Sequence, residues 1–77
     1  MEKINIKTEY ITLGQFLKLA SIVGSGVDAK MIIQNGEVMV NAEIEIRRGR
    51  KLRNLDQVSF DNQDFMVVYD NQENQIL

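Results

Sequence analysis

The sequence predicts an α+β fold in which two packed short helices are followed by a small antiparallel sheet. Apolar residues recur every three or four positions between residues 13 and 33, and at every second position after residue 37. The first spacing is typical of a helix with one buried face, and the second of strands with one buried face. A chain of 77 residues supports one domain with one small core. We expect this domain to span residues 1–70, followed by a polar, frayed tail over residues 71–77.

The first elements expected are a short strand over residues 3–7 and a helix that begins after Thr12. Thr12 is a suitable N-cap residue, and Gln15, three positions later, completes a capping box. The helix carries one apolar stripe, formed by Leu13, Phe16, Leu17 and Ala20. Gly24 is expected to end the helix, because glycine adopts the left-handed conformation of a C-terminal cap without strain.

A second helix is expected to begin after Ser25, another preferred N-cap residue. Asp28 falls in its first turn, where the helix dipole favours a negative charge. The buried face is formed by Ala29, Ile32 and Ile33. Asn35 and Gly36 are expected to end this helix by the same left-handed cap. Because a short turn joins the two helices, they should pack together as a helical hairpin or corner.

The second half of the sequence predicts a hairpin and two further strands. Residues 38–40 and 44–46 alternate, and Asn41, Ala42 and Glu43 form the turn between them, although Ala42 is poorly suited to a positive φ. Residues 58–60 form the next alternating segment, residues 61–64 a polar turn, and residues 65–69 the last strand.

The composition excludes most catalytic and metal sites. The chain has no Cys and no His, so thiol nucleophiles, zinc sites and a Ser-His-Asp triad are ruled out. The carboxylates after residue 54 lack the spacing of a calcium loop. We therefore expect a non-catalytic binding module without a cofactor or a metal. The sequence also lacks an apolar run long enough for a membrane span or a signal peptide, which predicts a cytoplasmic protein with no membrane partner.

The charged residues are unevenly distributed. The net charge is -2, yet residues 47–53 read RRGRKLR and carry five bases without an acid. These cations suit phosphate groups, and Gly49 lets the backbone approach them closely. If all five contact phosphate, log K should fall against log salt with a slope of about -3.5 for a single strand or about -4.5 for B-form DNA. The basic residues are Arg47, Arg48, Arg50, Lys51 and Arg53.

The charge pattern by itself leaves other interpretations open. A basic run is most often solvated surface, and these arginines could pair with Glu43, Glu45 and Asp56. The same run could also dock an acidic protein partner. For nucleic acid, only Tyr10 and Tyr69 are expected to be free for base stacking. So few stacking residues favour recognition of the shape and backbone of folded RNA over reading of a single strand.

A family resemblance favours nucleic acid over the other interpretations. Residues 12–60 resemble the RNA-binding domain first seen in small-subunit ribosomal protein S-4, also called the alpha-L RNA-binding motif. The whole chain is similar to short stand-alone bacterial proteins made of this domain alone, through LGQFLKLA at residues 13–20 and RRGRKLR at residues 47–53. The other matching positions are Ser25, Ala29, Lys30, Ile32, Ile33, Gly36, Val38, Val40, Asn41, Asp56 and Val58.

The resemblance implies a module that recognises structured RNA, either ribosomal RNA or tRNA, in ribosome assembly or translation. In the family, the two helices and the adjoining hairpin form one RNA-docking face. Two family arginines are replaced here, by Thr12 and Gly26, and the basic run is expected to compensate. The ribosome or a larger protein is the expected partner. The residues expected to contact RNA are Lys30, Gln34, Asn41, Arg47, Arg48, Arg50, Lys51 and Arg53.

A charge reversal at two of these positions tests the assignment. Arg47→Glu combined with Arg50→Glu is expected to abolish RNA affinity and to leave the fold unchanged.

Overall fold

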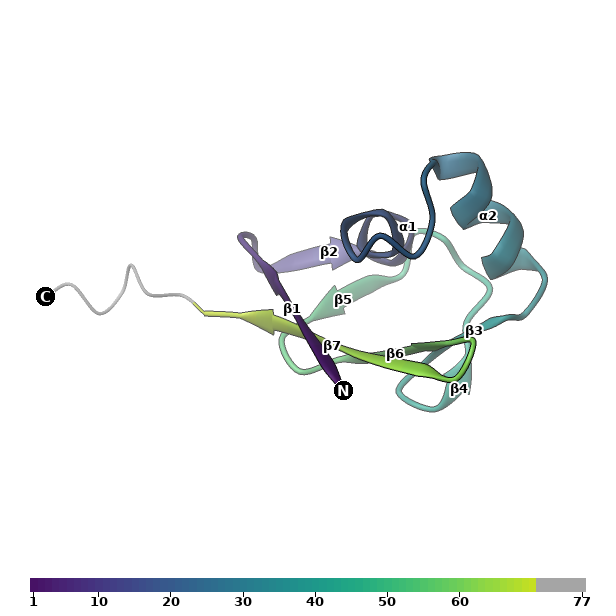
Figure 1. Cartoon of the computed structure of the whole chain (residues 1–77). Helices are drawn as coiled ribbons and strands as arrows, with labels where there is room; N and C mark the ends of the chain where they lie inside the picture. The colour runs from purple at the N-terminus through teal and green to yellow at the C-terminus, as the bar shows by residue number, and fades with distance from the viewer. Residues whose placement is uncertain (71–77) are drawn as a thin grey trace, which may run out of the picture.

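The computed structural model describes residues 1–70, so the predicted tail over residues 71–77 lies outside the described residues. The predicted α+β fold is confirmed, with both helices in the first half of the chain. In Figure 1 the helices lie on one side of the molecule, the larger sheet on the other, and the β2–β5 pair between them. The elements are β1 Glu2–Ile6, β2 Tyr10–Thr12, α1 Leu13–Leu19, α2 Gly26–Gln34, β3 Val38–Val40, β4 Glu43–Ile44, β5 Lys51–Arg53, β6 Gln57–Phe60 and β7 Gln63–Tyr69.

The five-stranded sheet has the order β1-β7-β6-β3-β4 and is mixed, which corrects the expectation of a purely antiparallel sheet. Strand β1 runs parallel to β7, with Glu2 opposite Phe65 and Ile6 opposite Tyr69. A parallel pair needs a long connection between its strands, and here nearly the whole domain supplies it. Alternation of apolar residues predicts a strand but carries no information about its direction.

A second, two-stranded sheet pairs β2 with β5. Ile11 lies opposite Leu52, and the Leu52 side chain is fully buried. Residues 51–53 of the basic run are therefore a strand. This pairing ties the basic residues to the chain just before α1.

The predicted start of each helix is confirmed. The Thr12 Oγ1 accepts a hydrogen bond from the Gln15 N–H (3.3 Å), and the Ser25 Oγ accepts one from the Asp28 N–H (3.2 Å). The predicted end of α2 is also confirmed, since Asn35 is its C-cap and Gly36 has a φ of +75°.

The predicted end of α1 at Gly24 is wrong. The helix ends at Leu19, and Ser21 takes the left-handed conformation with a φ of +60°. The Ile22 N–H then donates to the Leu17 carbonyl (2.9 Å), which closes a Schellman motif. Ile22 and Val23 pack against the core after this turn. Their burial explains why the chain leaves the helix earlier and with a residue other than glycine.

The two hairpin turns are tighter than expected, because each has two residues with positive φ. Asn41 and Ala42 (φ +51° and +71°) join β3 to β4, and Asp61 and Asn62 (φ +51° and +62°) join β6 to β7. This is the geometry of type I′ turns, whose twist matches that of paired strands. As a result β7 begins at Gln63 rather than at residue 65, and β4 covers Glu43–Ile44 rather than residues 44–46.

The core lies between the helices and the large sheet. The rings of Phe16 and Phe65 meet edge to face with centroids 6.4 Å apart, linking α1 to β7. None of the helices in the described chain is long and apolar enough to cross a membrane. The buried apolar residues are Ile6, Leu13, Phe16, Leu17, Ala29, Ile33, Val38, Val40, Leu52, Val58, Phe65 and Val67.

Candidate nucleic-acid interface

The basic run passes directly over the start of α1. The Leu13 N–H donates to the Arg50 carbonyl (2.8 Å), and the Gly14 N–H donates to the Arg48 carbonyl (3.0 Å). With Gln15 bonded to Thr12, the first three N–H groups of α1 are satisfied by the protein itself. The start of α1 therefore anchors the basic run and does not bind an anion.

Gly14 makes this close approach possible. A Cβ at this position would lie 2.7 Å from the Arg48 Cγ, well inside contact distance. A glycine in the first turn weakens a helix, and here it allows the Arg48 side chain to lie across α1. Gly14 was the sequence feature that could have indicated such a contact.

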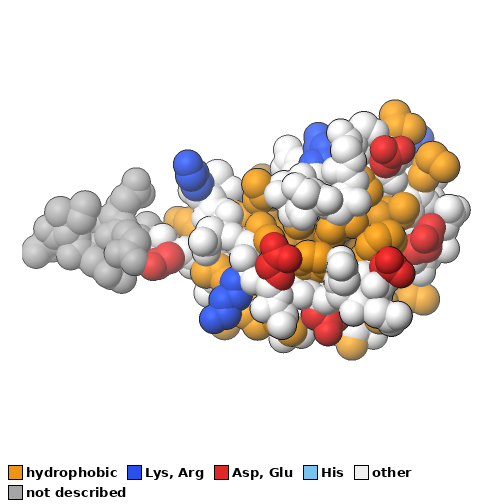
Figure 2. Space-filling model, in the orientation of Figure 1, with side chains coloured by type: hydrophobic (Ala, Val, Ile, Leu, Met, Phe, Trp, Pro, Cys, Tyr) orange, Lys and Arg blue, Asp and Glu red, His pale blue; other side chains and the backbone are white. Residues whose placement is uncertain are grey.

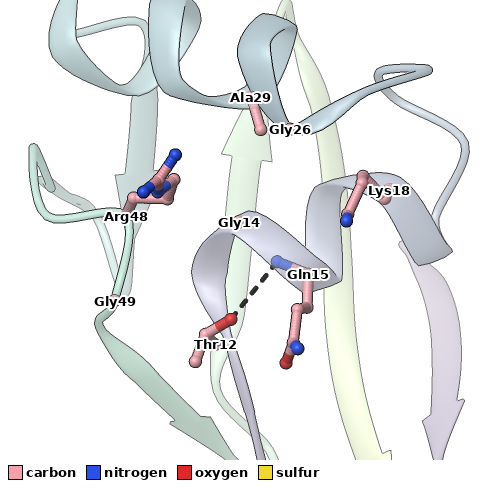
Figure 3. Close-up of a pocket in the computed structure, with 8 residues that line it drawn as sticks. All are labelled: Thr12, Gly14, Gln15, Lys18, Gly26, Ala29, Arg48 and Gly49. Atoms are coloured by element: carbon pink, nitrogen blue, oxygen red, sulfur yellow. Dashed lines mark hydrogen bonds between the residues drawn. The ribbon is translucent and has the colours of Figure 1, made fainter.

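A groove of about 310 Å³ lies between the two helices and the basic run (Figure 3). Figure 3 shows Arg48 and Lys18 on opposite sides of this groove, with Gly26 and Ala29 of α2 above it. Ser25 caps the Asp28 N–H, which leaves the Gly26 and Val27 N–H groups without an intrahelical partner. The groove is lined by Thr12, Gly14, Gln15, Lys18, Gly26, Ala29, Arg48 and Gly49.

The lining of this groove suits a phosphate group. Lys18 and Arg48 bring two positive charges, and the dipole of the nine-residue α2 adds to them at its start. Asp28, in the same first turn, opposes this effect. The small residues in the lining leave room for the phosphate oxygens.

Two of the five bases in the run are occupied by a buried carboxylate, Glu45. Its side chain is 8% exposed and forms salt bridges with Arg47 (2.9 Å) and Arg50 (2.8 Å). It also accepts hydrogen bonds from the Arg47 N–H (3.0 Å) and Nε (2.9 Å). These hydrogen bonds, above all those from Arg47 and then Arg50, lower the pKa of Glu45 to about 2. The alternative of pairing with nearby acids therefore holds for Arg47 and Arg50, with Glu45 as the partner rather than Glu43 or Asp56.

This ion-pair cluster corrects the expected result of the charge reversal. Arg47→Glu with Arg50→Glu would place two further carboxylates beside the buried Glu45 and remove both of its partners. An unpaired buried charge destabilises a fold strongly. That double variant would disrupt the fold together with any binding, so it cannot test the interface.

The other three bases, Arg48, Lys51 and Arg53, have no carboxylate within ion-pair distance in the described chain. The Lys51 Nζ lies 4.8 Å from the centroid of the Tyr10 ring, and the Arg53 Cζ lies 5.5 Å from it. An aromatic ring holds a cation in place without neutralising it. These charges therefore remain available to a ligand.

A second hollow, of about 500 Å³, continues the groove along the basic run. It is lined by Arg47, Gly49, Arg50 and Lys51, and it shares Gly49 with the first groove. We call the surface from Lys18 through Arg48 and Lys51 to Arg53 the basic track.

The comparison with known protein families agrees with this architecture. The chain matches the model of the S4 domain over residues 4–68. It belongs to the S4 domain family. The match extends beyond the predicted core of residues 12–60 and includes part of β1 and most of β7.

Two individual proteins are similar to this S4 domain over more than half of its length. Over 49 residues it is 59% identical to the probable ribosome maturation protein RlbA of Bacillus subtilis (strain 168), covering 64% of this chain and 69% of RlbA. The solution structure of YbcJ from E. coli, which revealed an alfaL motif involved in RNA-binding, matches with a TM-score of 0.68 and 32% identity. That match covers 88% of this chain and 87% of YbcJ. The predicted alpha-L fold is thereby confirmed.

A larger ribosomal protein shares the fold alone. The 30S ribosomal protein S4e from Thermoplasma acidophilum matches with a TM-score of 0.63 at 23% identity. The match covers 86% of this chain, and the chain spans about a third, 35%, of that protein's length.

The S4 domain does not bring all of the predicted contact residues together. Lys30 and Gln34 are exposed on α2, outside the lining of the groove. Asn41 is engaged elsewhere, because its Nδ2 donates to Asp56 (3.1 Å) and its Oδ1 accepts from the Gln57 N–H (2.9 Å). Asp56 in turn accepts from the Arg53 N–H (2.7 Å), so it is a turn residue as expected. We therefore assign Asn41 to the fold rather than to the interface.

Two residues outside the predicted contact set lie beside the basic run. Lys18 faces Arg48 across the groove in Figure 3. Tyr10 holds two of the free cations. On the face shown in Figure 2, acidic side chains lie mostly over the sheet half of the molecule and the few visible bases at its margins. Among the described residues, no three acidic side chains gather closely enough to hold a metal ion.

Proposed function

We propose that this S4 domain is a non-catalytic module that binds structured RNA, ribosomal RNA or tRNA, along the basic track. The proposal depends on three cations, Arg48, Lys51 and Arg53, which have no ion-pair partners in the described chain. Arg47 and Arg50, by contrast, are paired with Glu45. Arg48 also reaches the groove at the start of α2. This arrangement offers several phosphate contacts along one surface, which is what an RNA backbone requires.

The relatives support a role in ribosome assembly or translation. RlbA is described as a probable ribosome maturation protein, and YbcJ carries a motif involved in RNA-binding. Such a role would place the protein in the cytoplasm beside the ribosome or a larger protein partner. The recognition would depend on the shape and phosphates of a folded RNA, since the bases of an A-form helix are hard to reach.

A matched pair of variants tests this proposal. Arg48→Gln with Lys51→Gln removes two charges from the basic track, and Lys3→Gln with Lys7→Gln removes two exposed charges outside it. Binding of ribosomal RNA fragments is titrated at two salt concentrations, with the fold checked by circular dichroism. We expect the first variant to lose at least 10-fold in affinity and its salt slope to shrink by about 1.4 to 1.8. The second should change affinity less than twofold.

The result also separates this proposal from a protein-docking role. An acidic protein partner on the same track would be mimicked by polyglutamate, which should then compete with RNA at equal charge. We expect polyglutamate to compete poorly, because it lacks the fixed phosphate spacing of a folded RNA. Equal losses in the two variants, or no binding to any structured RNA, would refute the proposal.

A further inference from the structure

Tyr10 forms an aromatic platform at one end of the basic track. Tyr10 lies on β2 directly opposite Arg53 on β5. Lys51, also on β5, is the diagonal neighbour of Tyr10. Their neighbours Ile11 and Leu52 belong to the core side of the sheet, so alternation places Tyr10, Lys51 and Arg53 on the outer face. Tyr10 is 40% exposed.

The two cations are positioned by the ring and not by acids. Lys51 Nζ and Arg53 Cζ lie 4.8 Å and 5.5 Å from the ring centroid, and neither forms a salt bridge within residues 1–70. The core needs only Ile11 and Leu52 from this small sheet. A large aromatic side chain flanked by two unneutralised charges is thus a feature that folding does not require.

We propose that Tyr10, together with Lys51 and Arg53, is a stacking site for an unpaired nucleotide beside the folded RNA held by the basic track. This inference rests on the proposed RNA-binding function and names the kind of RNA. The base would stack on the tyrosine ring or on the guanidinium plane of Arg53, and Lys51 would bind its phosphate. The preferred ligand is then a helix with a bulged or overhanging nucleotide, not a plain duplex.

Lys51 connects the basic track to the Tyr10 ring. Lys51 lines the second hollow of the track and also lies over the Tyr10 ring. A strand whose phosphates follow Arg48 and Gly49 would therefore pass Lys51 and bring its next nucleotide to Tyr10. A duplex cannot offer a free base there, because its bases are stacked on one another.

Tyr69 provides an internal control. It is half-buried against the core, and its backbone N–H is bonded to Asn54 (2.7 Å). The chain has no Trp and two Tyr, so Tyr69→Phe leaves Tyr10 as the single tyrosine fluorophore. Its emission then reports whether a base stacks on Tyr10.

The experiment compares three RNAs: a short hairpin, the same hairpin with a three-adenosine overhang, and that overhang with abasic sites. We expect the adenosine overhang to raise affinity about 5- to 100-fold over the hairpin and to quench Tyr10 emission, whereas the abasic overhang does neither. Tyr10→Phe should keep this advantage. Tyr10→Leu should lose it, so that this variant binds the plain hairpin and the overhang with equal affinity.

The outcomes separate this inference from the function on which it rests. If the plain hairpin binds but adenosines add no affinity and no quenching, the stacking site is wrong and the basic track stands. An overhang advantage that survives Tyr10→Leu overturns it as well. If no RNA binds, the proposed function itself fails. The quenching measurement uses an intact Tyr10, so it decides the matter even if Tyr10→Leu folds poorly.

Discussion

Glu45→Gln should destabilise the fold by about 2 kcal/mol at pH 7. The native carboxylate accepts four hydrogen bonds, three from Arg47 and one from Arg50, at 2.8 to 3.0 Å. A glutamine keeps one accepting oxygen but turns an NH₂ group toward donors on arginine. The arginine donors on that side of the group then lose an acceptor, and the remaining hydrogen bonds join a neutral amide to charged guanidinium groups.

The pKa of Glu45 sets the magnitude. Its fall from 4.5 to about 2 corresponds to about 3 kcal/mol of stabilisation above both pKa values. The side chain of Arg47 is 70% exposed, so solvent screens part of the attraction. We therefore take about 2 kcal/mol as the expected loss. Because the folded-state pKa is the lower one, this stabilisation is complete above about pH 5 and is lost as the pH falls toward 2.

Urea unfolding followed by circular dichroism at pH 7, 5, 4 and 3 measures the effect. Glu43→Gln, which removes the same charge from an exposed position two residues away, is the matched control. Wild type and control should lose stability more steeply than Glu45→Gln between pH 5 and 3, so that the gap narrows. A Glu45→Gln protein within about 0.5 kcal/mol of wild type at pH 7 would refute the reasoning, since ordinary surface substitutions fall in that range.

Three further predictions follow from the local geometry. Ala42→Gly should raise the free energy of unfolding by about 1 kcal/mol, because a φ of +71° strains alanine but not glycine; an unchanged urea midpoint would contradict this. Gly14→Ala should leave stability within about 1 kcal/mol of wild type, since alanine favours the helix while its Cβ displaces Arg48. Gly14→Ala should weaken RNA binding several-fold, and adding Arg48→Ala to this variant should reduce the RNA affinity little further. For a B-form duplex, the slope of log K against log salt should be about -3.6 rather than the -4.5 expected from five free basic residues. The four charges that give this slope are those of Lys18, Arg48, Lys51 and Arg53. A slope of about -5.4 would mean that Arg47 and Arg50 leave Glu45 and also contact phosphate when RNA binds.

Local chemistry was predictable from the sequence wherever a few adjacent residues decide the structure. The caps at Thr12, Ser25 and Gly36 are of this kind, because a side chain or a free φ acts within three or four positions. The end of α1 was missed because Ile22 and Val23 are drawn into the core, which a local pattern does not show.

The orientation of residues 44–46 shows the same limit. The alternation suggested a strand with two isoleucines on one face, but it does not say which face is buried. The two-residue turn at Asn41 and Ala42 sets the register, and Ile44 and Ile46 are 64% and 62% exposed while Glu45 is buried. Arg47 and Arg50 make that burial possible by pairing with the carboxylate.

The sequence by itself determined the α+β class, the helix starts and the existence of one concentrated basic run. Tertiary structure decided the parallel pairing of β1 with β7, the β2–β5 sheet and the division of the basic run into paired and available charges. The physical reason is the separation along the chain of the residues that interact. Caps, turns and charge density depend on neighbours along the chain, whereas Tyr10 lies some forty residues from Lys51 and Arg53, and only the folded chain brings them together.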